Sequence, residues 1–443
     1  MSELTISGYG DELTINGVRI GDLGPAGHEA IEMEKGGQNY APLEDVVVSR
    51  VANSSTLICR KPDPQGLKAY IEEDLLDGLC CYSAVNQGQL NKTIVDAVIA
   101  HLQDEQIPTV PRSIRHKYMA AFLLAATAVT EMDKVVPKVA GVEAPELMAK
   151  LSRRWGYRIK GIPANGALIV VAADNFHGRS LFAVSASTDP SSRDDFGPFL
   201  PGIEVVPFND AAALEKLFKE KGDRIASFIV EPIQGEAGVI LPAADYHSRV
   251  AELCRQYNVL YCLDEVQTGF GRTGANFAHQ LYGVKPDLMA CGKAAGGGIM
   301  PVSFVAGSKE VINVLTPGSE GSTFGGFPLA AVTAVFAIKA LVDENLAGNA
   351  RAMGGRLLSH FKDIKDEFPD KIKEVRGAGL LTAFEMHADP ALDGHKVSLK
   401  LLENGIYAKE THRTTVRLAP ALTITPTGID QIGEAIRKVI QAL

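Results

Sequence analysis

Apolar runs alternate with amphipathic stretches through the middle of the chain. Four short runs have the composition of buried strands: 167–173, 203–207, 225–230 and 259–263. Residues 211–221 and 243–257, which lie between these runs, carry the apolar spacing of helices. Near-continuous apolar strands separated by helices are typical of a mostly parallel sheet that is covered on both faces. The pattern therefore predicts an α/β fold for this region.

The two ends of the chain have a different texture. The first 40 residues are rich in glycine and weakly patterned, so we expect a leading arm with short strands. After Pro328 the spacing predicts helices first, then short strands, then a final amphipathic helix. These elements are expected at 329–341, 347–368, 379–384, 415–418 and 428–443.

The length of 443 residues is too great for one compact core, so we expect more than one domain. We interpret residues 1–82 as an N-terminal arm with part of a small domain. Residues 83–328 are expected to form a large domain, and residues 329–443 a small C-terminal α+β domain.

Composition and charge exclude several classes of protein. The net charge is −9 and no run is rich in lysine or arginine, so nucleic acid is not an expected partner. The six cysteines show no metal-ligand spacing and fit buried free thiols in a reducing compartment, and no metal site is expected. The longest apolar stretch, 119–129, is too short to cross a bilayer, and the acidic N-terminus does not resemble a targeting peptide. These features predict a cytoplasmic protein without a membrane partner.

Polar residues follow each apolar strand of the middle region. The polar segments are 174–179, 231–236 and 264–269, and Lys293 follows the short apolar run 288–291. The carboxyl ends of parallel strands share one edge of a sheet, where ligands bind. Polar loops are common, so one such strand would carry little weight. Four strands with the same ending indicate a crevice at this edge.

Lys293 lies among glycines, alanines and apolar residues with no acid nearby in the sequence. A lysine in a dry site has a lowered pKa, and its neutral amine can form a Schiff base. A lysine that reaches from a loop to solvent explains the same pattern equally well. Asp264 favours the first interpretation, because a carboxylate directly after an apolar strand needs a cationic or hydrogen-bonding partner. A lysine and an aspartate are what a pyridoxal phosphate (PLP) site needs.

A cradle for the phosphate is predicted at residues 139–145, which precede a helical pattern at 146–155. Glycine beside a helix N-terminus, where N–H groups are free, forms an anion site, and Pro145 suits the first turn. Many helices begin in this way, so the signal is weak by itself. The chain has no GxGxxG, Walker-type or HExxH motif, which removes the usual support for nucleotide and zinc-protease functions.

Several stretches of the chain resemble the class III PLP-dependent aminotransferases, and most closely those that act on ornithine at its δ-amine. The similarity is dense over 141–344 and recurs at both ends. The stretches that carry it are 39–43, 82–88, 228–238, 263–274, 292–293, 321–326 and 416–420. The resemblance implies the PLP-dependent transferase fold type I, with a large domain built on a mostly parallel sheet flanked by helices and a smaller α+β domain.

The resemblance assigns roles around the cofactor. Lys293 and Asp264 are the implied catalytic residues: Lys293 holds PLP as a Schiff base and moves a proton, and Asp264 pairs with the ring nitrogen. The other implied cofactor-binding residues contact the ring or the phosphate. They are Phe176 and Val266 on the ring faces, Gln267 on the phenolic oxygen, Gly141 and Val142 on the phosphate, and Ser322 and Thr323 on the phosphate of a neighbouring subunit. A homodimer with shared active sites follows.

The resemblance also implies transfer of the terminal amine of ornithine to 2-oxoglutarate, which gives glutamate and glutamate 5-semialdehyde. Tyr40 and Arg179 would hold the α-carboxylate of the donor, and Tyr82 would line the pocket. Arg179 and Arg417 would bind the two carboxylates of the acceptor. Glu236 would pair with Arg417 while the donor is bound and release it for the acceptor, so that one site serves two substrates.

Three departures from the ornithine enzymes leave the donor open. Ala140 stands where a serine or threonine is usual, residues 89–92 stand where they have a His-rich pair and proline, and the 40–82 segment looks longer than theirs. His177 also replaces a tryptophan of the ornithine enzymes, but histidine is common there in the wider class. The alternative is a class III aminotransferase for another ω-amino acid or amine, such as acetylornithine, GABA, lysine or a polyamine. An inactive PLP-binding protein, and an α/β oxidoreductase or binding protein without PLP, are the remaining hypotheses.

Overall fold

The computed structural model describes residues 5–7, 12–15, 18–19, 47–62, 70–389 and 393–443. These residues divide into two compact units. One unit contains Met1–Arg50 and Ile58–Asp74, and the other contains Val51–Leu57 and Leu75–Leu443. Tyr40 lies outside the described residues, so the structure does not place it.

The first unit is built from short strands. Strands β1 (Ile6–Ser7), β2 (Thr14–Ile15) and β3 (Val18–Arg19) form an antiparallel sheet. Most of β4 (Val47–Asn53), β5 (Thr56–Pro62) and β6 (Tyr70–Asp77) also belongs to this unit. Glu72 on β6 pairs with Arg50 and Arg60. The short strands expected near the N-terminus are therefore confirmed.

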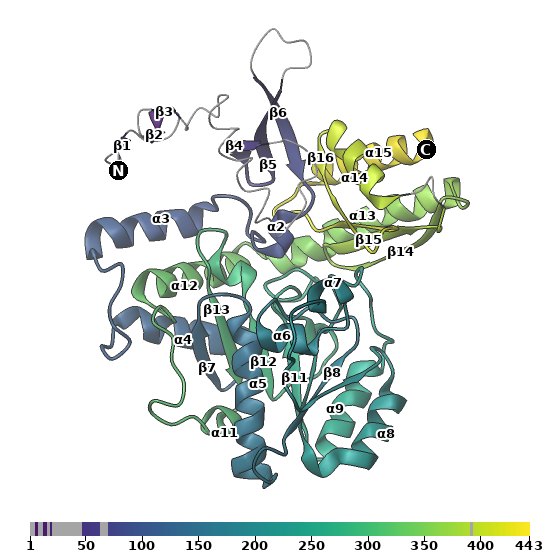
Figure 1. The fold of residues 1–443 in the computed structure, drawn as a ribbon. Helices are drawn as coiled ribbons and strands as arrows, with labels where there is room; N and C mark the ends of the chain where they lie inside the picture. Colours follow the sequence, from purple (N-terminus) through teal and green to yellow (C-terminus); the bar gives the residue numbers. More distant parts are fainter. Residues whose placement is uncertain (1–4, 8–11, 16–17, 20–46, 63–69, 390–392) are drawn as a thin grey trace. The chain divides into compact units, whose positions relative to one another are not determined.

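A seven-stranded sheet forms the centre of the second unit (Figure 1), in the order β7-β13-β12-β11-β10-β8-β9. The strands are β7 (Lys134–Lys138), β8 (Leu168–Ala172), β9 (Ile203–Val206), β10 (Ile225–Val230), β11 (Leu260–Asp264), β12 (Leu288–Cys291) and β13 (Ser303–Gly307). The five neighbouring strands β9, β8, β10, β11 and β12 run parallel to one another, and β13 is antiparallel to both of its neighbours. The predicted α/β class with a mostly parallel sheet is confirmed. Strands β7 and β13 were not expected from the sequence.

Helices cover both faces of this sheet because its strands are apolar on both sides. On β8, Ile169 and Val171 pack in the same cluster as helix α5 (Glu143–Trp155). Val170 faces the other way, toward helices α8 (Ala211–Lys221) and α9 (Tyr246–Gln256). Burial of each such side chain stabilises the fold by about 1.5–3 kcal/mol. The two-sided core explains why the strand runs contain no polar alternation.

Further helices complete the second unit around the sheet. Helices α4 (Lys117–Thr130) and α12 (Pro328–Asp343) pack together beside β13. The shorter segments are α2 (Cys80–Ser83), α3 (Lys92–Ala100), η3 (His101–Glu105), η4 (Gly156–Lys160), α6 (Leu181–Ala186), α7 (Pro190–Arg193), η5 (Gly222–Arg224), α10 (Ala278–Leu281), η6 (Lys293–Gly296) and α11 (Lys309–Ile312). None of the described helices has the length and apolar character that a membrane span requires.

The C-terminal region has the expected α+β character. A four-stranded antiparallel sheet has the order β14-β15-β18-β17 and packs with helix α13 (Leu346–Glu367), which also contacts the terminal helix α15 (Pro426–Ala442). The remaining elements are β14 (Ile372–Ala378), β15 (Leu381–Met386), α14 (Gly394–Glu403), β16 (Ile406–Tyr407), β17 (Lys409–Thr411) and β18 (Thr415–Leu418). Strand β15 begins two residues later than predicted because Gly379 turns the chain with a φ of +54°.

Candidate active site

A cavity of about 260 Å³ lies at the carboxyl edge of the central sheet. Its walls come from the residues after β8, β10 and β11, from the start of α5 and from Lys293. The sequence predicted that polar strand ends would meet at this edge, and the structure brings them together. The residues that line the cavity include Gly141, Val142, Phe176, His177, Glu231, Asp264, Val266, Gln267 and Lys293.

Lys293 follows β12 directly and opens η6 with a φ of +46°, a conformation that is uncommon for a residue with a side chain. Its amine makes no hydrogen bond or ion pair with any described residue. Burial lowers the pKa of this amine, and the opposing charges of Glu236 and Asp264 do not cancel the effect. The Lys293 amine therefore loses its proton more readily than an ordinary lysine does, and it faces the cavity without a partner among the described residues.

Asp264, the last residue of β11, is held by two hydrogen bonds. Its Oδ2 atom lies 2.7 Å from Nδ1 of His177, and its Oδ1 atom accepts from the backbone N–H of Val266 at 3.1 Å. Both Asp264 and His177 are buried. Burial by itself lowers the pKa of His177, but the hydrogen bond and the charge of Asp264 raise it above its ordinary value. The sequence analysis did not identify this partner of Asp264, although His177 was visible as a departure from the ornithine enzymes.

A second buried carboxyl group lies beside this pair and was not assigned a role from the sequence. Glu231 follows β10, and its Oε2 atom accepts from the backbone N–H of Phe176 at 3.2 Å. Burial raises the pKa of Glu231 to about 8, Asp264 adds to the shift, and His177 opposes it. Glu231 therefore exchanges a proton in the physiological range beside the Asp264–His177 pair.

The loop before α5 offers free N–H groups to the cavity. Among the described residues, the backbone N–H groups of Gly141 and Val142 have no acceptor. Those of Val139 and Ala140 instead donate to Oε2 of Glu143, at 2.9 and 2.7 Å. Helix α5 begins at Glu143, three residues earlier than expected, and Pro145 lies in its first turn as predicted. The loop predicted to bind the phosphate therefore offers two free N–H donors, those of Gly141 and Val142.

Arg417 on β18 is buried and forms an ion pair with Glu236, which is half-buried. Its Nη1 atom lies 2.7 Å from Oε1 of Glu236, and the exposed fraction of Arg417 is 3%. The hydrogen bond and charge of Arg417 lower the pKa of Glu236, although burial alone would raise it. The Tyr82 ring lies 5.8 Å from the guanidinium carbon of Arg417. The backbone carbonyl of Glu236 also accepts from the Thr411 hydroxyl at 2.6 Å, which holds the chain that carries Glu236 in place.

The structure leaves the other predicted residues farther from the centre of the cavity. Arg179 is exposed and lies 5.6 Å from the ring centroid of Phe176. Ser322 and Thr323 do not line this cavity, and Thr323 is exposed. They lie just beyond Glu320, which pairs with two lysines, one of them buried.

Comparisons with known proteins agree with this geometry. A sequence model of the family described as Aminotransferase class-III matches residues 55–440. An ornithine aminotransferase of Arabidopsis thaliana is 43% identical over 416 residues, which cover 93% of this chain and 84% of the relative. An ornithine aminotransferase of Exiguobacterium is 40% identical, with 93% of this chain and 98% of the relative covered.

Solved structures give the same result. The crystal structure of an ornithine aminotransferase from Toxoplasma gondii superposes with a TM-score of 0.86 at 35% identity, covering 94% of this chain and 95% of that chain. An acetylornithine aminotransferase from Elizabethkingia anophelis superposes with a TM-score of 0.81 at 37% identity, covering 94% and 99%. Fold type I is confirmed. The chain belongs to the class III aminotransferases, which use PLP to move an amino group from a donor to a 2-oxo acid.

Proposed function

We propose that this chain is an ornithine:2-oxoglutarate δ-aminotransferase, which converts ornithine and 2-oxoglutarate to glutamate 5-semialdehyde and glutamate. The semialdehyde cyclises to pyrroline-5-carboxylate. The observation that carries the proposal is the ion pair of the buried Arg417 with Glu236, because a masked arginine allows one site to take substrates that differ in their carboxylates. The curated relatives named as ornithine aminotransferases support the choice of donor.

The residues around the cavity fit PLP. Two backbone N–H groups without acceptors, at Gly141 and Val142, suit a phosphate at the start of a helix. The buried carboxylate of Asp264 suits a protonated ring nitrogen, and the unbonded amine of Lys293 suits an aldehyde carbon. Phe176 and Val266 would bracket the ring, and Gln267 would bond its phenolic oxygen. When bound, PLP supplies an electron sink for the carbon that carries the amine.

The side chains of the chain itself supply the proton transfers and the binding. Nζ of Lys293 would take a proton from the donor carbon and later return one, and its lowered pKa favours the basic form that this requires. Asp264 would place its carboxyl group beside the ring nitrogen in a dry site, and the hydrogen bond between His177 and Oδ2 would hold it there. Lys293 and Asp264 are thus the proposed catalytic residues.

Arg417, Glu236 and Arg179 are proposed to sort the two substrates. With the donor bound, Glu236 stays on Arg417. With 2-oxoglutarate bound, the acceptor's carboxylate replaces Glu236 on Arg417 while Arg179 takes the other carboxylate. Tyr82, beside Arg417, would line the pocket, and Tyr40 would hold the α-carboxylate of ornithine. Replacement of Glu236 by alanine unmasks Arg417, so the proposal expects a higher KM for ornithine with the acceptor half-reaction largely retained.

A homodimer is part of the proposal. Ser322 and Thr323 do not line the cavity of their own chain, and Thr323 is exposed, which suits a contact with the phosphate of a partner subunit. Hybrids of Lys293→Ala and Thr323→Ala subunits test this. If Thr323 serves the partner, each hybrid contains one intact site and activity returns on mixing; if it serves its own chain, mixing restores nothing. The cytoplasmic location stays a prediction.

Acetylornithine is the second candidate donor, because an enzyme named for it is 37% identical to this chain over 94% of its length. Rapid-mixing absorbance spectra of the PLP form with ornithine, N-acetylornithine, GABA, lysine and a polyamine decide between them. The proposal expects ornithine to give the fastest conversion to the amine form. Fast conversion by N-acetylornithine with none by ornithine would overturn the choice of donor and leave the class unchanged.

A further inference from the structure

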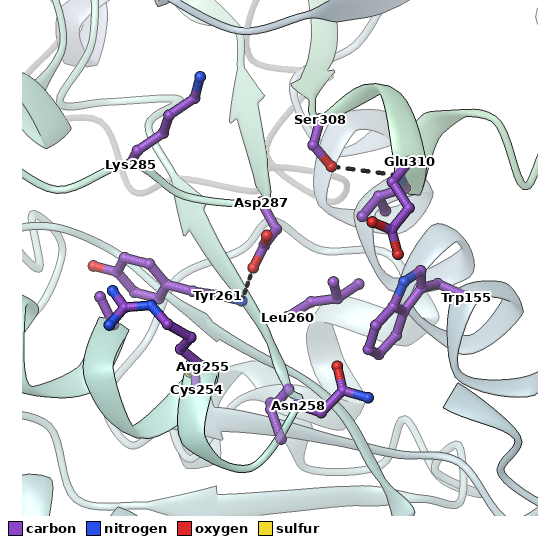
Figure 2. Close-up of a pocket in the computed structure, with 13 residues that line it drawn as sticks. Trp155, Cys254, Arg255, Asn258, Leu260, Tyr261, Lys285, Asp287, Ser308 and Glu310 are labelled. Carbon is purple, nitrogen blue, oxygen red and sulfur yellow. Dashed lines mark hydrogen bonds between the residues drawn. The ribbon is translucent and has the colours of Figure 1, made fainter. Parts of the chain in front are cut away.

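A second cavity of about 260 Å³ lies at the amino edge of the central sheet, at the opposite end of β11 and β12 from Asp264 and Lys293 (Figure 2). The end of α5, the end of α9, the first residues of β11 and the start of α11 surround it. None of the residues that line it takes part in the proposed reaction. Its chemistry therefore calls for a separate explanation.

The cavity contains a buried hydrogen-bond donor without an acceptor. Trp155, the last residue of α5, lines the cavity and has an exposed fraction of 3%. Its indole Nε1 is buried and has no partner among the described residues. A buried donor left unsatisfied costs about 1–3 kcal/mol, so a group that enters the cavity and accepts from this N–H removes a penalty present in the empty protein.

The charged side chains at the rim are not paired with one another. Figure 2 shows Arg255 and Lys285 on one side, Glu310 on the other, and Asp287 between them. No ion pair joins any of these four side chains to another described residue. Among the described residues, the carboxylate of Asp287 accepts one hydrogen bond, from the backbone N–H of Tyr261 to Oδ2 at 2.8 Å. Burial raises the pKa of Asp287 and the charge of Glu310 raises it further, so a cation at this position would be stabilised.

We propose that this cavity binds a small zwitterion of the α-amino acid class. Its carboxylate would bind Arg255 and Lys285, its ammonium would bind Asp287 and Glu310, and an oxygen of the ligand would accept from Trp155. A simple anion would leave the two carboxylates unpaired, and a simple cation would leave the two bases unpaired. Arg255, Lys285 and Glu310 are exposed, and Asp287 is half-buried. A molecule with both charges pairs with both sides of this rim and also accepts from the buried indole.

The protein carries its own reporter for this site, because Trp155 is the only tryptophan in the chain. The experiment titrates the PLP-loaded enzyme with L-serine and follows tryptophan emission together with the visible absorbance of the cofactor. Sodium acetate and ethylammonium chloride, at the same concentrations and ionic strength, serve as single-charge probes. The proposal expects a saturable change of emission with L-serine, no change in cofactor absorbance over the same range, and weak responses to acetate and ethylammonium.

Two variants connect the signal to the cavity. Asp287→Asn and Arg255→Gln should each raise the dissociation constant for L-serine about tenfold, because each removes one charge that the ligand pairs with. Arg255 is exposed, so this variant keeps the test usable if Asp287→Asn fails to fold. Arg249→Gln is the matched control, since Arg249 lies on the same helix but does not line the cavity. Absence of an emission change, an equal response to acetate alone, or equal affinity in the Arg255 variant and the control would each overturn the proposal.

Discussion

His177 is the side chain whose replacement tests the site most directly. It gives Asp264 a hydrogen bond at 2.7 Å within a buried environment, and no second side chain among the described residues bonds to Oδ2 of Asp264. A hydrogen bond to a charged group contributes about 1.5–3 kcal/mol. His177→Phe removes it without emptying the space, so we expect the dissociation constant of PLP to rise about 10- to 100-fold, at about 1.4 kcal/mol per tenfold.

The assay is a titration of apoenzyme with PLP, followed by visible absorbance at several pH values. The pKa of His177 is raised in the folded protein, so the stabilisation it provides is fully present below its ordinary pKa of 6.5 and is lost as the pH rises through the higher folded value. The gap in the free energy of unfolding between wild type and His177→Phe, measured by denaturant titration at the same pH values, should therefore be widest at acid pH. His177→Asn keeps a donor near the position of Nδ1 and should recover part of the affinity.

The control is His101→Gln, which alters an equally buried histidine whose Nε2 bonds only to a backbone carbonyl, that of Ile107. It should leave PLP affinity unchanged. If His177→Phe binds PLP as tightly as wild type at every pH, then Asp264 does not depend on His177, and the reasoning from their geometry is wrong.

Three further predictions concern stability in denaturant titrations. Between about pH 4.5 and 8, Glu231 holds a proton in the folded protein that it releases in the unfolded chain, so the free energy of unfolding of the wild type falls as the pH rises. The fall is at most about 1.4 kcal/mol per unit of difference between the folded and unfolded pKa values. Glu231→Gln should flatten this pH dependence. Gly354→Ala should destabilise the protein by about 2 kcal/mol or more, the size of an overpacking penalty, because its Cβ would lie 1.8 Å from the Gly379 carbonyl oxygen. Gly355→Ala, whose Cβ would meet open space, should stabilise the protein by about 0.5–1 kcal/mol. Arg272→Met should cost about 3 kcal/mol or more, because three buried oxygens lose their donor; a loss below about 1 kcal/mol would contradict this.

Much of the fold could be predicted because local pattern decides it. Strands β8, β10 and β11 are buried on both sides, and helices α8, α12 and α13 have apolar residues at helical spacing, so their extents follow from the sequence to within about a turn. Strands β7 and β13 escaped prediction because their apolar runs are short and carry no periodic signal of their own. Only pairing within the sheet makes them strands.

The residues of the site divide in the same way, into those that the sequence reveals and those that only the structure reveals. Motifs in the sequence determined the family and pointed to Lys293 and Asp264, because an isolated lysine and a carboxylate after an apolar strand are visible without a fold. The structure alone decided that His177 supports Asp264, since these residues are 87 positions apart. They meet only at the carboxyl edge of the sheet, after strands β8 and β11, which β10 separates. It also decided that the one tryptophan, which the sequence presents as an ordinary end of a helix, leaves its N–H unsatisfied in a charged cavity. The sequence around a residue indicates which chemistry its side chain can perform. Long-range packing determines which partners that side chain has in the folded protein.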